Sequence, residues 1–265
     1  MVTLATMTVV VTGGTRGVGY ALARAFAAAG QRVVICGRDE HVARAAAARI
    51  GSGAVGTAAD VTRRTDVERL WERATGEFGA VDHWVNNAGA GMRPRLLWEA
   101  PAEGVTEVIA VNLLGSLHGS AVAIAGMLRQ GHGFVWNTLG FGSNARVSRG
   151  MAAYGCSKRA LDYLHRALLL ETDGTPVRVG LVDPGLVLTD LVVDTGIATD
   201  ELRGRRQQWY YRVLADPVDV VAPWLARRML AASRTDARVL RLTPVRAVRR
   251  LAGAAVRERF SAARA

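Results

Sequence analysis

An apolar strand that runs directly into a glycine-rich turn is the feature that most restricts the fold of this chain. Val9, Val10 and Val11 are followed by Thr12-Gly13-Gly14-Thr15-Arg16-Gly17-Val18-Gly19, and a helical pattern begins near Gly19. Glycine lets the backbone turn tightly and approach a pyrophosphate, whose charge is stabilised by the free N–H groups at the start of the following helix. The pattern therefore predicts a dinucleotide site. Its expected contacts are Gly13, Thr15, Arg16, Gly17, Val18 and Gly19.

The rest of the chain alternates short apolar runs with longer amphipathic stretches. Buried strands are expected at residues 9–11, 32–36, 81–85, 133–137 and 177–182, and helices at 21–29, 41–50, 66–78, 106–130 and 154–171. Repeated strand–helix units predict an α/β fold, a doubly wound parallel sheet of the Rossmann type in three α/β/α layers. We expect residues 1–265 to form a single domain. The ligand should lie at the carboxyl ends of the strands.

The end of the second strand bears on the choice of nucleotide. An acid there would bind the ribose diol of NAD, but the chain reads Cys36-Gly37-Arg38-Asp39. Arg38 is a cation suited to a 2′-phosphate, and Arg16 in the glycine turn is expected to reach the same group. Asp39 is the competing acid, although its position after Arg38 is typical of a helix N-cap. The sequence favours NADP(H) over NAD(H).

The positive charge is concentrated at the end of the chain. Of the 34 basic residues, 15 arginines lie after residue 202, against four acidic residues, so this part of the chain supplies the whole net charge of +11. We expect residues 239–265 to form a basic C-terminal extension, either a solvated face or subunit contact, or a weak contact with an anionic membrane surface. No recognition motif accompanies these arginines, so specific nucleic-acid binding is not expected.

The composition also indicates where the protein resides. The two cysteines, Cys36 and Cys156, have neither metal-ligand nor disulfide-framework spacing, which is typical of a reduced, intracellular protein; we expect a cytoplasmic location and no metal. The N-terminal residues read as a strand and not as a signal peptide. We expect no transmembrane helix, because no run of about 18 uninterrupted apolar residues occurs.

Lys158 is the only lysine in the chain, and it follows Tyr154 by four residues in Tyr154-Gly155-Cys156-Ser157-Lys158. On a helix this spacing places both side chains on one face. A compact ammonium on a flexible stem is not interchangeable with a planar guanidinium. On an exposed face either cation would serve, but the neighbouring tyrosine favours a chemical role.

These motifs resemble the short-chain dehydrogenase/reductase family over most of the chain. The resemblance implies that Asp60 and Val61 lie at the adenine, that Asn87, Ala88 and Gly89 line the cofactor cleft, and that Thr189 contacts the nicotinamide amide. The motifs that carry it are Thr12 to Gly19, Asp60-Val61, Asn86-Asn87-Ala88-Gly89, Asn112, Tyr154 with Lys158, and Pro184-Gly185 with Thr189.

The resemblance also implies a chemistry. Tyr154 becomes the general acid or base, because a nearby ammonium stabilises its phenolate and brings its pKa of about 10 closer to neutrality. Lys158 supplies that ammonium and binds the nicotinamide ribose, and Asn112 holds a water beside it. Hydride passes from the nicotinamide to a carbonyl carbon while Tyr154 protonates the oxygen.

One residue of the family pattern is absent. A serine usually ends the strand before the tyrosine and donates a hydrogen bond to the substrate oxygen, but Gly140 takes its place here. Loss of such a donor costs roughly 10²-fold or more in rate if nothing replaces it. Ser143, in a glycine-flanked loop, is the preferred catalytic substitute, and Thr138 is the alternative.

Within the family, the chain resembles the chlorophyll b reductase-like branch. The pattern Asn137-x-x-Gly140-x-Gly142-Ser143 before Tyr154 carries this resemblance, together with Asn112-Leu113-Leu114-Gly115-Ser116 and the late Leu242-Thr243-Pro244. Branch members carry an acid where this chain has Leu139. The resemblance implies a bulky hydrophobic carbonyl substrate and a homodimer or homotetramer, and the Ala- and Arg-rich composition is typical of a bacterial protein.

Substrate contacts are expected from two segments that the fold constrains least. One contains Met92, Arg93, Pro94 and Trp98; the other is a lid at residues 190–215 with Trp209 and Tyr210. The function predicted is NADP(H)-dependent reduction of a ketone or aldehyde on a bulky hydrophobic molecule. Two alternatives remain open: a non-redox proton transfer such as dehydration, cyclisation or isomerisation, and a nucleotide-sensing binding protein.

Overall fold

The computed structural model describes residues 6–187, 209 and 213–262 of the chain. Seven parallel strands form one sheet in the order β3-β2-β1-β4-β5-β6-β7. The order reverses between β1 and β4, which neighbour each other in the sheet but not in the sequence. The strands are β1 (Thr8–Val11), β2 (Arg32–Gly37), β3 (Val55–Ala58), β4 (His83–Asn86), β5 (Gly133–Thr138), β6 (Val177–Asp183) and β7 (Ala237–Leu240).

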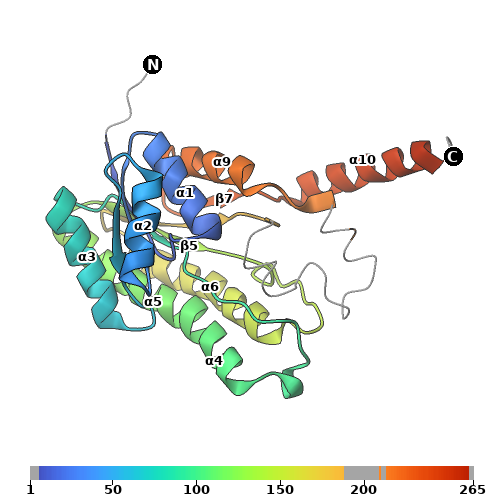
Figure 1. Cartoon of the computed structure of the whole chain (residues 1–265), viewed down its shortest axis with the longest axis horizontal. Helices are drawn as coiled ribbons and strands as arrows, with labels where there is room; N and C mark the ends of the chain where they lie inside the picture. Colours follow the sequence, from blue (N-terminus) through green and yellow to red (C-terminus); the bar gives the residue numbers. More distant parts are fainter. Residues whose placement is uncertain (1–5, 188–208, 210–212, 263–265) are drawn as a thin grey trace.

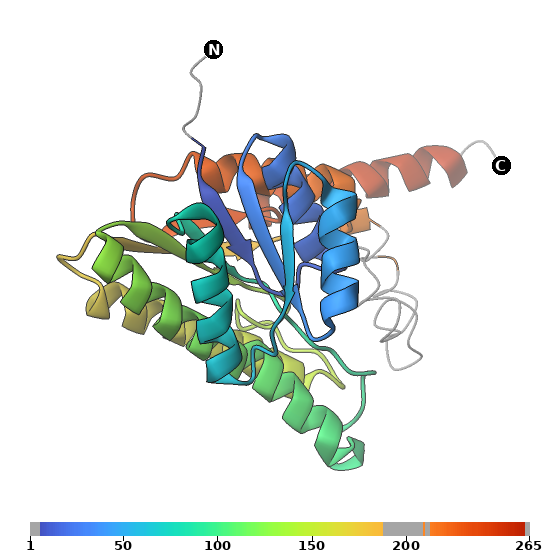
Figure 2. The same ribbon diagram turned by 60° about the vertical axis from the view of Figure 1, so that its left-hand side comes forward.

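Helices cover both faces of the sheet (Figures 1 and 2). On one face lie α1 (Gly17–Ala28), α2 (Glu40–Ile50) and α9 (Val218–Leu230), whose buried side chains share one apolar cluster with the sheet. On the other face lie α3 (Arg64–Phe78), α5 (Gly115–Gln130) and α6 (Ala152–Glu171), which pack around a second cluster. The predicted single-domain Rossmann fold in three layers is confirmed.

The strand sequences explain why the sheet is buried on both faces. Val9 and Val11 point into one apolar cluster and Val10 into the other, and all three are fully buried. Continuous apolar strands of this kind are typical of parallel sheets between two helical layers. On β5, Trp136 and Val135 alternate in the same way.

The expected strands and helices are all present, but the two edge strands, α9 and the helix at Pro244–Ala262 were not predicted. β3 reads Val55-Gly56-Thr57-Ala58, and β7 reads Ala237-Arg238-Val239-Leu240. Each pairs on one side and is too short and mixed in character to give a strand pattern. The predicted extension at 239–265 begins within β7. α9 contains Pro223, which obscures its helical pattern.

The helix predicted at 106–130 is longer than expected and changes geometry in the middle. α4 (Ala102–Ile109) continues through a π-helical turn, η2 (Ala110–Leu114), into α5. A π turn inserts one extra residue and frequently marks a functional site. Asn112 lies in this turn and is fully buried.

The same stretch, Ala102–Gln130, is the one helical run of the described residues long and apolar enough to cross a membrane, with a mean hydropathy of 1.7. Its α5 part contacts α3, β4 and β5. Val122, Ala123 and Met127 are buried in the core cluster on that side of the sheet. These contacts are those of a core helix that packs on a sheet.

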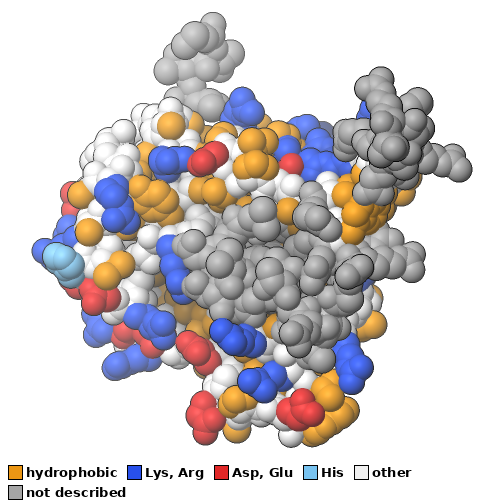
Figure 3. Space-filling model, turned by 45° about the vertical axis from the view of Figure 1, so that its right-hand side comes forward, with side chains coloured by type: hydrophobic (Ala, Val, Ile, Leu, Met, Phe, Trp, Pro, Cys, Tyr) orange, Lys and Arg blue, Asp and Glu red, His pale blue; other side chains and the backbone are white. Residues whose placement is uncertain are grey.

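The basic C-terminal segment forms α10 (Pro244–Ala262), which extends away from the body (Figure 1). Arg250 anchors its base through ion pairing with Asp216 at 2.7 Å and donates to the Leu214 carbonyl oxygen. Lys and Arg side chains are not confined to α10: Figure 3 shows them spread over one face of the body, with Asp and Glu side chains between them.

Candidate active site

The glycine turn folds as its sequence predicts. Gly13 has a φ of +64°, and a Cβ atom built on it would lie 2.8 Å from the Ala88 Cα. The turn and the loop after β4 are held together by the Thr12 hydroxyl, which accepts from the N–H groups of Asn87 and Ala88 at 3.0 Å. No side-chain hydrogen bond caps the start of α1, and the N–H groups of an uncapped first turn favour an anion.

A pocket of about 460 Å³ opens at the carboxyl ends of the strands, where the strand order reverses. It brings together most of the residues that the sequence predicts to bind the nucleotide. These are Gly13, Thr15, Arg16, Gly17, Val18, Gly19, Arg38, Asp60, Val61, Asn87, Ala88, Gly89, Tyr154, Lys158 and Pro184. Gly185 follows Pro184 in a turn with a φ of +73°. Thr189 lies outside the described residues.

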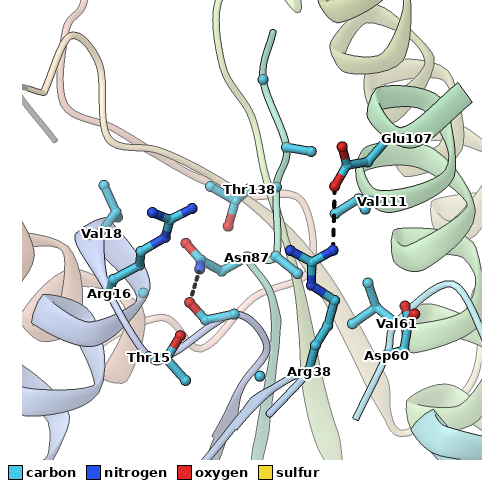
Figure 4. A pocket seen from close by; sticks show the side chains of 18 of the residues that line it. Thr15, Arg16, Val18, Arg38, Asp60, Val61, Asn87, Glu107, Val111 and Thr138 are labelled. Atoms are coloured by element: carbon cyan, nitrogen blue, oxygen red, sulfur yellow. Dashed lines mark hydrogen bonds and ion pairs between the residues drawn. The ribbon is translucent and has the colours of Figure 1, made fainter. Parts of the chain in front are cut away.

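The end of β2 presents a cation to the pocket. Arg38 Nη1 lies 3.4 Å from Glu107 Oε1 of α4, and the two side chains point toward one another across the opening (Figure 4). The Asp39 carboxylate accepts from the Val42 N–H at 2.9 Å and caps α2, as predicted. Arg16 also lines the pocket, but Figure 4 shows it on the other side of Asn87 from Arg38.

The adenine-side acid predicted from the family resemblance is engaged in its own loop. One oxygen of the Asp60 carboxylate accepts from the backbone N–H of Thr62 at 2.9 Å and from its hydroxyl at 2.8 Å. Val61 lies beside it and is buried against Gly115. Both residues line the pocket near Arg38 (Figure 4).

Tyr154 and Lys158 meet on one face of α6, and both line the pocket. Lys158 Nζ donates to the Thr138 carbonyl oxygen at 3.1 Å and lies 5.9 Å from the centre of the Tyr154 ring. The lysine is 5% exposed. Burial lowers its pKa from 10.5 to about 8, and the negative charge of Asp183 opposes that shift. The sole lysine is therefore a buried charge within the pocket.

Gly140 lies directly against this pair. A Cβ atom built on it would lie 2.7 Å from the Tyr154 hydroxyl oxygen and 3.4 Å from Lys158 Cε. The position is thus the one predicted for the absent serine, and glycine leaves room for the tyrosine hydroxyl.

The two candidate substitutes for that serine differ in their contacts. The Ser143 hydroxyl donates to the Gly140 carbonyl oxygen at 2.8 Å, and Ser143 is not among the residues that line the pocket. Thr138 does line it, is 7% exposed, and its hydroxyl has no hydrogen-bond partner among the described residues. A buried hydroxyl without a partner is uncommon and calls for a ligand or water. The geometry favours Thr138, which the sequence analysis ranked second.

Asn112 connects the site to the loop after β4. Its side chain accepts from the Ala90 N–H at 2.7 Å and donates to the Ala90 carbonyl oxygen at 3.1 Å and to the Ser157 hydroxyl at 3.0 Å. These contacts use its amide to fix the residue before Lys158. The water-holding role that the resemblance implies for Asn112 stays a prediction.

The substrate side of the pocket is described in part. Trp98 is 81% exposed on a 3-10 turn, Leu97–Glu99, and Pro94 is buried. Of the predicted lid, the structure describes residue 209 and residues 213–215; Tyr210 lies outside them. Trp209 is half-buried. Among the described residues, no group of three or more His, Cys, Asp and Glu side chains could hold a metal ion.

A parallel sheet with a phosphate turn at its reversal of order, and a tyrosine and a buried lysine in the same pocket, defines a dinucleotide-binding oxidoreductase fold. Residues 7–199 match the short chain dehydrogenase family. The chain belongs to this family, as its motifs predict.

Named relatives place the chain near one branch. It is 35% identical to chlorophyll(ide) b reductase NOL of Arabidopsis thaliana over 84% of this chain and 65% of that protein. It is 30% identical to the probable chlorophyll(ide) b reductase NYC1 of the same plant over 90% of this chain and 51% of that protein. The chain thus spans less than two thirds of these two relatives. Carbonyl reductase family member 4 of Xenopus tropicalis is 31% identical over 72% of this chain and 78% of that protein.

Solved structures support the same fold. A 3-ketoacyl-(acyl-carrier-protein) reductase from Brucella melitensis complexed with NADH has a TM-score of 0.76 and 25% identity over 89% of this chain and 96% of that chain. A short chain dehydrogenase/reductase from Burkholderia phymatum in complex with NAD has a TM-score of 0.75 and 26% identity, over 89% of this chain and 90% of that chain.

Proposed function

We propose that the protein is an NADP(H)-dependent reductase that converts a ketone or aldehyde on a bulky hydrophobic molecule into the alcohol. The observation that carries this proposal is the meeting of Tyr154 and Lys158 in the pocket that begins at the phosphate turn. A nucleotide bound on that turn would extend along the pocket toward this pair. A binding protein that senses nucleotide has no need of either side chain.

The residues present fit a nicotinamide dinucleotide. Gly13 and Gly19 bring the turn so close to Ala88 and Asn87 that side chains there would not fit. The uncapped start of α1 favours the pyrophosphate, and Arg38, Asp60 and Val61 surround the adenine end. When bound, the dinucleotide supplies the two electrons of the reduction.

The protein's own part is to bind and protonate the carbonyl oxygen. Tyr154 gives its proton to that oxygen as negative charge develops on it. The Lys158 ammonium stabilises the phenolate that remains, and its hydrogen bond to Thr138 fixes its place. The unpartnered Thr138 hydroxyl supplies a second donor for the oxygen or for the bound nucleotide.

The preference for NADP(H) is supported chiefly by Arg38. Asp39, the competing acid, is engaged as the cap of α2, whereas the Arg38 guanidinium faces the pocket. A guanidinium and a phosphate form charge-assisted, often bidentate, hydrogen bonds. Because the Brucella and Burkholderia structures contain NADH and NAD, the nucleotide preference needs its own measurement. The contribution of Arg16 stays a prediction.

The names of the relatives support a carbonyl substrate, since two of those reported are reductases of chlorophyll(ide) b and one is a carbonyl reductase. Trp98, which is 81% exposed on the segment expected to contact the substrate, supports a bulky, apolar one. We further propose a homodimer or homotetramer. The outer faces of α5 and α6, where Leu117, Leu128, Tyr163 and Leu170 are 40–82% exposed, would form its interface.

A cytoplasmic location and a weak contact of α10 with anionic membrane surfaces are also proposed. The first rests on the two free cysteines, and the second on the 15 arginines after residue 202. Removal of residues 245–265 tests the membrane contact. Binding of the protein to vesicles that contain phosphatidylserine should weaken, and unchanged binding would show that α10 does not make this contact.

The experiment that tests the function measures the loss of NADPH absorbance against a panel of bulky aldehydes and ketones. Wild-type protein should consume NADPH, and Tyr154→Phe should not, while both bind the nucleotide. Turnover of a panel compound without NADPH consumption would instead support the non-redox alternative. Nucleotide binding with no turnover of any kind would support the sensor.

A further inference from the structure

Asp183, the last residue of β6, places a carboxylate on the sheet face that carries α6. The β6 side chains alternate between the two layers: Leu181 packs against Leu161 of α6, whereas Val182 joins the cluster formed with α1 and α9. Asp183 continues this alternation and therefore faces α6. α6 is the helix that carries Tyr154 and Lys158.

The ammonium of Lys158 comes to the same end of the sheet. Its hydrogen-bond acceptor is the carbonyl oxygen of Thr138, the last residue of β5. Thr138 is the register partner of Val182, the residue before Asp183. The carboxylate and the ammonium thus lie beside the ends of two paired strands.

The Asp183 carboxylate is held in place by the turn that follows β6. Its Oδ1 accepts from the Gly185 N–H at 2.8 Å. This turn contains Pro184, which lines the pocket together with Lys158. The carboxylate is therefore fixed by the turn that follows β6, next to a residue of the pocket wall, and is not a freely rotating surface group.

The surroundings of Lys158 contain little else that is charged. Among the described residues, the titratable groups that face it are Tyr154 from its own helix and Asp183 from β6. β5 presents the Thr138 carbonyl and Gly140, and Asn112 from η2 is neutral. Burial raises the pKa of Asp183, and the Gly185 N–H and the Lys158 charge oppose that rise. Each charge thus offsets part of the desolvation of the other.

We infer that Asp183 is the counter-ion of Lys158, a positioning residue that keeps the buried ammonium charged at neutral pH. Its importance for turnover rests on the proposed function, since a neutral amine would stabilise the Tyr154 phenolate less. The electrostatic pairing itself does not depend on any substrate. It can be measured in the free protein.

The composition of the chain provides a direct probe. Because Lys158 is the only lysine, protein grown with ¹³C-lysine gives one lysine Cε resonance, whose pH titration reports the Lys158 pKa. In Asp183→Asn, this pKa should fall by about one pH unit or more. Asp162→Asn is the matched control. Asp162 lies on α6, the helix of Lys158, but it pairs with the surface residues Arg159 and Arg166. It should change the pKa far less.

An unchanged Lys158 pKa in folded Asp183→Asn, or an equal change in Asp162→Asn, would overturn the inference. Should Asp183→Asn fail to fold, the wild-type resonance provides the second test. It should show an additional inflection at acid pH as Asp183 takes up its proton, and a flat acid limb would overturn the inference. If the titrations agree but no carbonyl compound is reduced, the proposed function fails while the electrostatic interaction between Asp183 and Lys158 stands.

Discussion

Gly140 and Tyr154 are so close that a Cβ atom on the glycine would lie 2.7 Å from the tyrosine hydroxyl oxygen. The absent serine is therefore more than a missing hydroxyl. The Tyr154 hydroxyl occupies the space that a side chain at position 140 would need. The observed position of the tyrosine therefore requires glycine at position 140.

Gly140→Ala should lower kcat/KM by about tenfold or more, because the new methyl group displaces the acid from its place over the carbonyl oxygen. The affinity for NADPH should not change. Gly155→Ala is the control, since a Cβ atom there meets nothing within 4 Å although the residue adjoins Tyr154. Equal activity of the two variants would show that the contact with Gly140 has no catalytic importance.

The hydroxyl that replaces the serine can be identified with two isosteric changes. Thr138→Val should lower kcat by roughly 10²-fold, because its buried hydroxyl lines the pocket and has no protein partner. Ser143→Ala should have a smaller effect, since that hydroxyl already donates to the Gly140 carbonyl oxygen. Steady-state kinetics of both variants measure the two losses in kcat. A larger loss in Ser143→Ala than in Thr138→Val would identify Ser143 as the donor.

Replacement of Arg38 tests the nucleotide preference. Arg38→Gln should weaken NADPH binding roughly 10- to 100-fold, the equivalent of one charge-assisted hydrogen bond, and leave NADH binding unchanged. Arg24→Gln is a suitable control, because Arg24 pairs with Asp219 on the surface between α1 and α9. Titration of nucleotide fluorescence measures both affinities. Equal losses for NADPH and NADH would mean that Arg38 does not contact a 2′-phosphate.

His83 makes the fold sensitive to acid. Burial lowers its pKa from 6.5 to about 4, with Arg178 contributing and Asp82 opposing. Between these values the unfolded chain binds a proton that the folded protein does not, so stability falls as the pH drops from about 6.5 to 4, by about 3 kcal/mol in total.

His83→Gln should remove this part of the acid dependence and keep an acceptor for Trp136 Nε1, which donates to His83 Nδ1 at 3.0 Å. Urea unfolding at a series of pH values measures the free energy of unfolding for both proteins. If the two curves run parallel between pH 4 and 6.5, His83 is not the group responsible.

The parts of this structure that could be predicted from sequence are those with local signals. The glycine spacing predicts the turn at Thr12–Gly19. Three consecutive valines predict β1, because a central parallel strand is buried on both faces and is therefore apolar on both. β3 and β7 carry no such signal, since an edge strand pairs on one side and tolerates short, mixed sequences. The residues expected at the nucleotide belong to short family motifs, and most of them line one pocket in the structure; their contacts with a nucleotide stay a prediction.

The remaining site residues depend on contacts between distant parts of the chain. Glu107 reaches Arg38 across a separation of 69 residues, and Asp183 at the end of β6 acts on the charge of Lys158 on α6. Neither has a motif that would reveal it. The choice between Ser143 and Thr138 required knowledge of where each hydroxyl points, although the period-two alternation of the preceding strand could have drawn attention to Thr138.

The sole lysine serves Tyr154 from a buried position, which a guanidinium cannot occupy in the same way. The most direct test is the rate of NADPH-dependent carbonyl reduction by Lys158→Arg at neutral pH, with saturating nucleotide and substrate. We expect a loss of about 10²-fold or more, because the charge survives but its position beside the tyrosine does not. A Lys158→Arg protein that reduces the substrate at the wild-type rate would contradict it.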